Sequence, residues 1–443
     1  MSVIALIDGE HHPAVVRDAL DRVAAEQDIA ATLLVGGGEK IGRDVVGDPA
    51  AHYGREVTIP TGSVLAALRE LASTAEAEAV LDLSGEPVLE PEQRMNVACV
   101  ALESGLEYRN ADTHLTPPQR QPLKSDTPVI EVIGTGKRTG KTAVCGHLGR
   151  ILRADGRTPA IVSMGRGGPP EPQVVRADER PDLAGLLAIA RGGGHAASDY
   201  LEDAVLAGVD TVGCRRCGEG LAGQAFQSNM LDGARLALSL EPSELLVEGS
   251  GACIPPLAAD RTICVTSAPH AKAQALSYLG PLRVARADLL LLASADMVAA
   301  DQLEGLKRDL SEWAPKARKI GIAFAPEPAQ RLEPGTRVAV FTTAPPDASD
   351  GMRARLEQLD LEVKLFSTDL ARRAELERHL SSAADRDCDV YLTELKAAAI
   401  DMVAEGAERV GARTVFLRNT PVALAGEGDL DEALLDVAVG ARA

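Results

Sequence analysis

Short apolar runs alternate along the chain with longer stretches in which apolar residues recur at helical spacing. The runs at 3–8, 31–35 and 79–83 are rich in Val, Ile, Leu and Ala and are followed by Gly or Ser. Strands that alternate with amphipathic helices are typical of α/β proteins with largely parallel sheets. We therefore predict an α/β fold, in which a mostly parallel sheet is flanked by helices and further α/β units lie at both ends of the chain.

The same alternation continues to the end of the chain. The further predicted strands are 129–133, 158–163, 244–248, 262–266, 288–292, 319–324, 337–342, 362–366, 389–392 and 414–417. Residues 115–128 interrupt the pattern with four prolines in a polar stretch, which is typical of a linker. We therefore predict an N-terminal domain at 1–126 that binds substrate or forms an interface, a central domain at 127–310 and a C-terminal α/β domain at 311–443.

A glycine-rich loop follows the predicted strand 129–133 and leads into a predicted helix at 143–154. Its residues are Gly134, Thr135, Gly136, Lys137, Arg138, Thr139, Gly140, Lys141 and Thr142. In such loops the backbone N–H groups and the helix N-terminus bind phosphates, a lysine reaches the β and γ oxygens, and a hydroxyl ligates Mg²⁺. We predict a P-loop NTPase-type domain whose loop binds ATP, with Lys141 catalytic and Thr142 a Mg²⁺ ligand. The usual pattern has Gly in place of Thr135.

Two further strand ends carry side chains that suit phosphoryl transfer. Arg166 follows the strand 158–163 among glycines and is predicted to hold a phosphate, with an ordinary Gly/Pro turn as the alternative. Glu248 ends the apolar strand 244–248. Because a buried carboxylate without a partner is costly, we predict that Glu248 is catalytic and holds Mg²⁺.

Basic residues are conspicuous in this acidic chain, because a polyanionic ligand needs positive charge nearby. Lys137 and Arg138 lie inside the glycine-rich loop and are predicted to stabilise phosphate charge during transfer. Arg215 and Arg216 form a basic pair that suits the substrate, although surface charge explains them about as well. This pair lies in a segment where no strand is predicted, between the second and third strands of the central domain.

The seven cysteines do not indicate a disulfide framework, because their number is odd and their spacing irregular. Cys214 and Cys217 have a metal or redox spacing, but no second pair completes a four-ligand zinc site. The others lie in apolar runs and are predicted to be core thiols: Cys99, Cys145, Cys253, Cys264 and Cys388.

Three strand ends of the N-terminal domain are polar and contain glycine. Asp8, Glu10 and His11 follow the first strand, and residues 36–40 and 82–86 follow the next two. Since the carboxyl ends of parallel strands meet at one edge of a sheet, these segments predict a small-molecule crevice. We predict Asp8, Glu10 and His11 as substrate ligands there.

Composition narrows the choice of partners. The 443 residues are 45% hydrophobic, 25% charged and 2% aromatic, with a net charge of −19 that argues against a nucleic-acid partner. No run approaches the ~20 apolar residues that span a bilayer, and the N-terminus lacks a basic signal-peptide region. We expect a cytoplasmic protein without a membrane or nucleic-acid partner and, from its size and class, a homodimer.

Three segments together resemble those of the cyclic 2,3-diphosphoglycerate synthetases. They are 6–11, 132–142 and 200–204, and the likeness continues to 341–345 near the C-terminus. The resemblance implies an ATP-dependent ligase that phosphorylates 2,3-diphosphoglycerate and then closes an intramolecular pyrophosphate, with release of ADP and phosphate. It implies ATP and Mg²⁺ as cofactors. Positioning and charge neutralisation would fall to Lys137, Arg138, Lys141, Thr142, Arg166 and Glu248.

Two other functions are compatible with the glycine-rich loop. The loop and the segment 248–251 are also similar to those of dethiobiotin synthetase, another ring-closing ligase, but that similarity covers only the central domain. A nucleotide-switch metallochaperone or partition-type ATPase would instead use Cys214 and Cys217 as metal ligands. The residues alone assign no role to the C-terminal domain.

Overall fold

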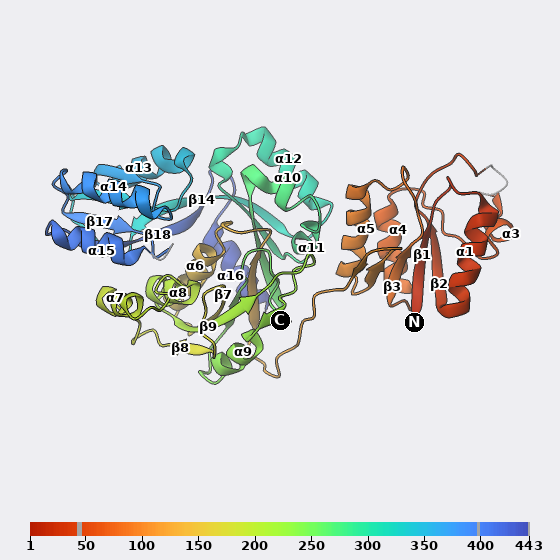
Figure 1. Cartoon of the computed structure of the whole chain (residues 1–443), viewed down its shortest axis with the longest axis horizontal. Coiled ribbons are helices and arrows are strands. Elements are labelled where there is room, and N and C mark those ends of the chain that lie inside the picture. Colours follow the sequence, from red (N-terminus) through yellow and green to blue (C-terminus); the bar gives the residue numbers. More distant parts are fainter. Residues whose placement is uncertain (42–46, 397–398, 442–443) are drawn as a thin grey trace.

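The computed structural model describes residues 1–41, 47–396 and 399–441, which form two β-sheets connected by a linker (Figure 1). The first sheet has the order β2-β1-β3-β4-β5, parallel except for the pair β4–β5. Its strands are β1 (Ser2–Ile7), β2 (Asp28–Leu34), β3 (Ala79–Asp82), β4 (Glu107–Arg109) and β5 (His114–Leu115). Its helices are α1 (Pro13–Glu26), α3 (Pro49–Tyr53), α4 (Val64–Thr74) and α5 (Pro91–Glu103).

The second sheet begins in the central domain with the order β10-β9-β7-β11-β6-β12-β13-β14. From β9 to β14 every pair is parallel, and the short strands β8 and β10 pair antiparallel with β9. These strands are β6 (Val129–Gly134), β7 (Ala160–Gly165), β8 (Gln173–Val175), β9 (Asp210–Cys217), β10 (Gln227–Ser228), β11 (Leu245–Glu248), β12 (Arg261–Ser267), β13 (Leu289–Ala293) and β14 (Arg318–Pro328).

The same sheet continues into the C-terminal part, but its direction reverses there. β14 pairs antiparallel with β18 (Arg413–Ala423), and β17 (Val390–Thr393), β15 (Arg337–Phe341) and β16 (Glu362–Ser367) then follow in parallel with β18. The long strands β14 and β18 cross between the two parts (Figure 1). As a result, the carboxyl ends of the central strands face the carboxyl ends of β15 and β17.

Helices cover both faces of this second sheet. Those of the central domain are α6 (Lys141–Ala154), α7 (Leu183–Arg191), α8 (Asp199–Ala207), α9 (Met230–Leu238), α10 (Ala271–Gln274), α11 (Pro281–Val284) and α12 (Ala300–Ser311). The C-terminal part has α13 (Ser349–Glu357), α14 (Arg373–Ala384), α15 (Ile400–Arg409) and α16 (Leu430–Gly440). Short 3₁₀ turns lie at Ala268–His270, Ala295–Met297 and Pro346–Ala348. Although it belongs to the end of the chain, α16 packs back on α6 of the central domain.

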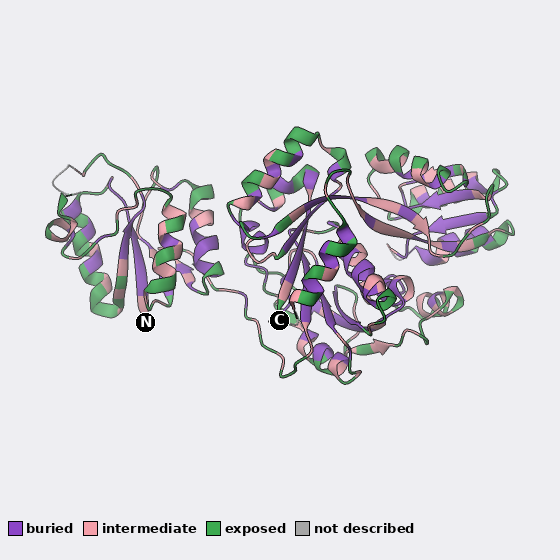
Figure 2. Ribbon diagram, turned by 180° about the vertical axis from the view of Figure 1, so that it is seen from behind, coloured by how far each residue is buried: buried purple, intermediate pink, exposed green. Residues whose placement is uncertain are grey.

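The central strands of both sheets are buried, whereas edge strands such as β8, β10 and β16 are partly exposed and the helices expose one face (Figure 2). Because aromatic residues are scarce, Val, Leu, Ile and Ala fill most of the core. One cluster of buried side chains spans the N-terminal and central domains, joining residues of α5 to residues of α11 and α12. At this contact the guanidinium of Arg69 lies 5.2 Å from the ring centroid of Trp313.

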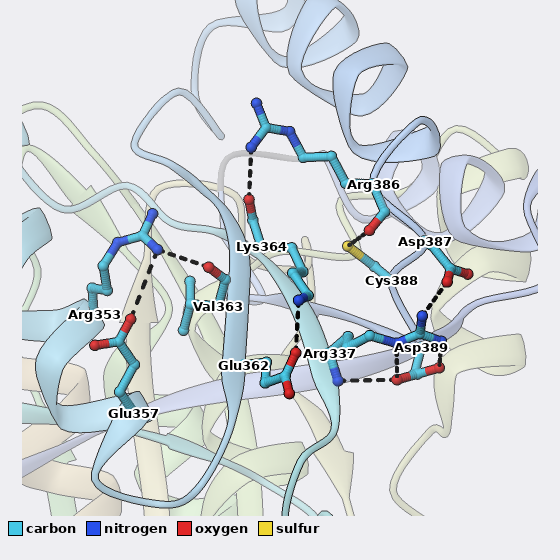
Figure 3. A network of polar contacts seen from close by, with 10 residues as sticks. All are labelled: Arg337, Arg353, Glu357, Glu362, Val363, Lys364, Arg386, Asp387, Cys388 and Asp389. Carbon is cyan, nitrogen blue, oxygen red and sulfur yellow. Dashed lines mark hydrogen bonds and ion pairs between the residues drawn. The ribbon is translucent and has the colours of Figure 1, made fainter.

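Ion pairs lie at the amino ends of the C-terminal strands (Figure 3). At the start of β15, Arg337 binds Asp387 and also Asp389, with 2.6 Å between Nη2 and Oδ1. Hydrogen bonds from Arg337 lower the pKa of Asp389 to about 2. This network aligns β15 and β17 at the ends that point away from the central domain, so their carboxyl ends remain available to a ligand.

Each strand predicted from the sequence has a counterpart, but the short strands β4, β5, β8 and β10 were not predicted, and two larger features also differ. The segment that contains Cys214 and Cys217 is the eight-residue strand β9, where no strand was expected. Its Arg216 obscures the apolar pattern, although that side chain is buried and hydrogen-bonded. The C-terminal strands also do not form a separate sheet, because β14 and β18 extend the central one. The domain boundaries at 126 and 310 stay predictions.

Candidate functional site

A cavity of about 880 Å³ lies where the two sets of strand carboxyl ends meet. The central domain contributes Arg166, the segment 248–251 and the glycine-rich loop from Lys137 onwards. The C-terminal part contributes the segment 343–345 and, from later in the chain, Glu394, Lys396 and Asn419. Pockets of this size are typical of small-molecule sites. The loop predicted to bind phosphates therefore forms a wall of this cavity.

The loop conformation depends on glycines at two positions. A side chain at Gly134 would lie 2.5 Å from the Thr139 hydroxyl and 3.0 Å from the Val265 carbonyl oxygen. Gly140 has a φ of +99°, and a Cβ atom there would overlap the ring of Phe324. A side chain at Gly134 or Gly140 would therefore overlap neighbouring atoms, so both positions need glycine. Gly140 also needs it because other residues rarely adopt its backbone conformation.

Thr135, the departure from the usual pattern, has a structural role. Its hydroxyl lies 2.8 Å from the Thr266 hydroxyl on β12, which neighbours β6. The Thr135 N–H also donates to the Val265 carbonyl. These bonds attach the base of the loop to the next strand, so a hydroxyl residue is useful where other loops have glycine.

Lys141 begins α6 and is buried at the bottom of the loop. Its ammonium donates to the Gly136 carbonyl over 2.8 Å. Burial lowers the pKa of Lys141, while the carboxylates of Glu248 and Asp199 act in the opposite direction. The lysine is therefore placed among groups that keep it oriented towards the loop.

Thr142 and Glu248 lie together, as a shared metal site requires. The Thr142 hydroxyl donates to Glu248 Oε1 over 2.5 Å, and the Ser163 hydroxyl donates to Oε2 over 2.7 Å. Burial raises the pKa of Glu248, and the nearby Asp199 raises it further. In the described part of the chain no three His, Cys, Asp or Glu residues form a metal cluster. Mg²⁺ usually takes one or two carboxylates and completes its shell with phosphate oxygens and water, so this donor set fits that ion.

The other predicted phosphate-binding residues also line the cavity. Lys137 and Arg138 project from the loop, and Arg138 has a left-handed backbone conformation with a φ of +62°. Arg166 follows β7, is half exposed, and lies 3.7 Å from Glu219. The ring of His195 packs against Gly167 and is a further lining group. The structure thus brings together the predicted catalytic residues, although their roles stay predictions.

The first five residues of α8 include three carboxylates that were not predicted as site residues from the sequence. Asp199 lines the cavity, and Glu202 and Asp203 lie behind it. Burial raises the pKa of each, that of Glu202 to about 7. Their spacing of three and four residues places them on one face of the helix. That spacing was the available signal, but without the fold nothing indicated that this face meets the glycine-rich loop.

The C-terminal part contributes a lysine whose side chain is 34% exposed. Lys396 Nζ lies 3.3 Å from Glu202 Oε1, across the boundary between the two halves of the sheet. The carboxylate of Glu202 raises the pKa of Lys396 above its ordinary value, although burial opposes the effect. Lys396 thereby adds positive charge to the cavity and links β17 to α8.

Glu394 organises the two strand ends beside Lys396. It accepts hydrogen bonds from the hydroxyls of Thr342 and Thr343, from the Thr343 N–H and from the Asn419 amide, at 2.7–2.8 Å. Burial opposes its ionisation, but Lys396 and these donors hold the pKa of Glu394 below its ordinary value. This carboxylate therefore positions the C-terminal wall of the cavity.

The three polar strand ends of the N-terminal domain do converge. Asp8 Oδ2 accepts from the Gly85 N–H at 2.7 Å, and its Oδ1 accepts from the N–H groups of Glu10 and His11. Glu10 Oε1 in turn accepts from the Gly38 N–H. These carboxylates bind backbone N–H groups of the three strand ends, and the cavity at the glycine-rich loop does not include them. Their role as substrate ligands stays a prediction.

Arg215 and Arg216 point to opposite faces of β9, as neighbours on a strand do. Arg215 Nε donates to the Pro169 carbonyl, and Arg216 donates to the carbonyls of Gly218 and Ser250. Arg216 also pairs with Glu219 at 2.8 Å. Both side chains have partners within the protein, and their predicted contact with substrate stays a prediction.

No helix in the described part of the chain is both long and apolar enough to cross a membrane. The predicted cytoplasmic location and homodimer stay predictions.

Comparison with known proteins covers nearly the whole chain. Family models of cyclic 2,3-diphosphoglycerate synthetase match the N-terminal domain at 2–116, the P-loop domain at 129–322 and the C-terminal domain at 331–420. The cyclic 2,3-diphosphoglycerate synthetase of Rubrobacter xylanophilus is 42% identical over 99% of this chain and 97% of its own length. Those of Thermococcus onnurineus and Pyrococcus furiosus are each 38% identical over 98% of this chain, and over 98% and 97% of their own lengths. The chain belongs to the cyclic 2,3-diphosphoglycerate synthetase family.

Proposed function

We propose that the protein is an ATP-dependent ligase that makes cyclic 2,3-diphosphoglycerate from 2,3-diphosphoglycerate. The γ-phosphoryl group of ATP is transferred to one phosphate of the substrate. The second phosphate then attacks the phosphorus of the first, and inorganic phosphate leaves as the ring closes. The observation that supports this most is one cavity that contains the glycine-rich loop together with basic side chains from separate parts of the chain.

Charge explains why these residues suit the reaction. ATP and 2,3-diphosphoglycerate are both polyanions, whereas the chain has a net charge of −19. The cavity is nevertheless lined by six cationic side chains beside five carboxylates; the cations are Lys137, Arg138, Lys141, Arg166, Arg355 and Lys396. Phosphoryl transfer depends mainly on positioning and on stabilising the charge of the transferred group, so this arrangement supplies what the chemistry needs.

The roles of the residues follow from where they lie. Backbone N–H groups of the loop and the N-terminus of α6 bind the ATP phosphates, and Lys141 binds the transferred group. Thr142 and Glu248 hold Mg²⁺, which neutralises phosphate charge when bound. Arg166 comes from the central domain and Lys396 from the C-terminal part, and together they hold the phosphorylated acid.

A direct assay tests the proposal. The protein is incubated with ATP, Mg²⁺ and 2,3-diphosphoglycerate, and phosphorus NMR follows the products. We expect ADP, inorganic phosphate and a new cyclic pyrophosphate signal in equal amounts. ATP hydrolysis without the cyclic signal would contradict the ligase function.

The variant Lys141→Ala tests whether the loop lysine is needed for turnover in a protein that still folds. Removal of the ammonium should reduce turnover by roughly 100-fold or more, because a preorganised donor to the developing charge is lost. Thermal unfolding of the variant, followed by circular dichroism, verifies that it folds. Full activity in Lys141→Ala would exclude the loop as the catalytic site.

The metallochaperone function has less support. Cys214 and Cys217 are three residues apart on β9, so they point to opposite faces of the sheet. Cys214 is buried and Cys217 is exposed. In this conformation the two thiols cannot share one metal ion. A dethiobiotin-synthetase-like activity would keep the chemistry, but the family match extends well beyond the central domain.

We also propose a homodimer, with Mg²⁺–ATP and 2,3-diphosphoglycerate as its ligands. Light scattering coupled to size-exclusion chromatography measures the mass directly, against 46.4 kDa for one chain. A mass of one chain at micromolar concentration would contradict the dimer.

A further inference from the structure

The cavity at the glycine-rich loop has two sides of different chemistry. The strand that leads into the loop, β6, has β11 and β7 on one side and β12, β13 and β14 on the other. The lining residues next to β7, β11 and α8 are polar or small, among them Arg166, His195 and the segment 248–251. This side of the cavity therefore offers charges and hydrogen bonds but little apolar surface.

The other side of the cavity is lined by larger apolar side chains. Met297 follows β13, Phe324 lies on β14, and Pro345 and Met352 come from the segment after β15. Met297 is 40% exposed, although methionine is usually buried. Asp296 adds a carboxylate to these walls. Apolar walls with a few polar groups are typical of sites for organic ligands that have apolar faces.

One face of α13 completes the apolar side. Ala348, Gly351, Met352 and Arg355 line the cavity at spacings of three and four residues, as residues on one face of a helix do. The helix packs against β14, whose Phe324 ring lies against the glycine-rich loop. A Cβ atom added at Gly351 would meet no atom within 4 Å, so the space in front of this face is open.

The two ligands of the proposed reaction differ in the same way as the two sides of the cavity. 2,3-Diphosphoglycerate carries two phosphates and a carboxylate on three carbons, and its surface is almost entirely polar. ATP has a flat aromatic base whose faces need apolar or aromatic neighbours. Since neighbouring strands are about 4.8 Å apart, β13 ends roughly 10 Å from β6, a separation that the ribose of a nucleotide can bridge.

We propose that the ends of β13 and β14 and the face of α13 bind the nucleoside of ATP, while 2,3-diphosphoglycerate binds on the side next to β7, β11 and α8. The inference rests on the proposed function and extends it to where each ligand lies. The base packs against Met297 and Met352, whose flexible thioether side chains adapt to its faces. The C-terminal part thus helps to bind the nucleotide.

The variant Gly351→Leu tests the nucleoside site by filling it. The new side chain enters open space on an exposed helix, and leucine favours a helix more than glycine does, so the fold should be kept. Gly305→Leu on α12 is the matched control, because Gly305 does not line the cavity and its added Cβ would meet only one atom, at 3.8 Å. Thermal unfolding verifies that both variants fold.

Isothermal titration calorimetry with Mg²⁺ measures the binding of three probes, namely ADP, inorganic pyrophosphate and 2,3-diphosphoglycerate. Pyrophosphate has no nucleoside, so its affinity reports on phosphate binding alone. We expect Gly351→Leu to weaken ADP binding by roughly tenfold or more, and Met297→Gln, which removes apolar contact, by roughly fivefold. The affinities for pyrophosphate and 2,3-diphosphoglycerate should stay within twofold of the wild type, and Gly305→Leu should leave all three unchanged.

Other results would overturn the inference. They are an ADP affinity of Gly351→Leu within twofold of the wild type, equal losses for ADP and pyrophosphate, or a loss of 2,3-diphosphoglycerate binding in that variant. The cyclic product is measured separately in the wild type. If ADP binding depends on Gly351 as expected but no cyclic product forms, the proposed function fails and the nucleoside site stands. If the product forms and Gly351→Leu binds ADP normally, only the nucleoside site fails.

Discussion

At Gly140 two independent constraints exclude a side chain. The backbone has a φ of +99°, which residues with a Cβ atom rarely adopt. The space for a Cβ is also taken by the ring of Phe324, which comes from β14. Because β14 leads into the C-terminal part of the sheet, one aromatic ring connects that part with the residue before Lys141.

Gly140→Ala should weaken ATP binding by roughly tenfold or more. Backbone strain of about 1–3 kcal/mol and the overlap with Phe324 both act against the binding conformation, and 1.4 kcal/mol corresponds to about tenfold. Isothermal titration calorimetry measures the affinity. The double variant Gly140→Ala/Phe324→Ala should recover part of it, because only the overlap is relieved. Gly62→Ala is the control, since no atom lies within 4 Å of the added carbon; equal affinities for Gly140→Ala and Gly62→Ala would refute the argument.

At the scale of elements, α6 contacts both the glycine-rich loop that precedes it and α16, the last helix of the chain. Its N-terminus completes the glycine-rich loop, and its middle packs on α16. There His147 Nε2 lies 2.6 Å from Asp431 Oδ1, while Arg150 donates to His147 Nδ1 over 3.1 Å. The imidazole is therefore neutral, with its proton on Nε2 and directed at Asp431. The last helix thus helps to position the helix that carries Lys141.

This contact predicts a pH dependence of stability. Burial lowers the pKa of His147 below its ordinary value of 6.5, although Asp431 opposes the shift. The unfolded chain therefore binds the proton more readily, and the free energy of unfolding falls as pH drops through 6.5 until the folded imidazole is also protonated. Urea unfolding from pH 8 to pH 5 should show a shallower decline in His147→Gln than in the wild type. The exposed His270→Gln should keep the wild-type slope, and an unchanged slope in His147→Gln would contradict the prediction.

At the scale of the whole molecule, the reversal of the sheet at β14–β18 creates the site. In a sheet that is parallel throughout, the carboxyl ends all point the same way. Here the reversal directs the ends of β15 and β17 towards the glycine-rich loop, so residues more than 200 positions apart line one cavity. The C-terminal part is therefore expected to take part in catalysis and not only to support the fold.

Lys396→Met tests this arrangement. It keeps much of the side-chain volume but removes the charge that faces the loop and leaves Glu202 without its partner. We expect kcat/KM for ATP to fall by roughly 100-fold, the usual effect of losing one charge-stabilising group. The control is Lys364→Met, whose ammonium pairs with Glu362 on the exposed edge of the same part (Figure 3). If both variants keep wild-type activity, the C-terminal wall has no catalytic role.

The sequence by itself determined the features that depend on neighbouring residues. Apolar runs identified the strands, and the spacing from Gly134 to Thr142 identified the phosphate loop, because such a loop is local in the chain. Arg166 and Glu248 were predictable too, since residues at the ends of parallel strands share one edge of a sheet.

Only the tertiary structure decided which distant groups meet. The face of α8 that carries Asp199, Glu202 and Asp203 looks like any solvated helix start in the sequence, and Lys396 looks like any surface lysine. The burial of Glu202 and Asp203, and the position of Asp199 and Lys396 beside them, follow from the reversal of the sheet and from the packing of α8 against α6, which no local pattern encodes. The sequence thus predicted one loop as the nucleotide site, and the fold decided which carboxylates and cations surround it, because burial and charge compensation are properties of contacts between distant residues.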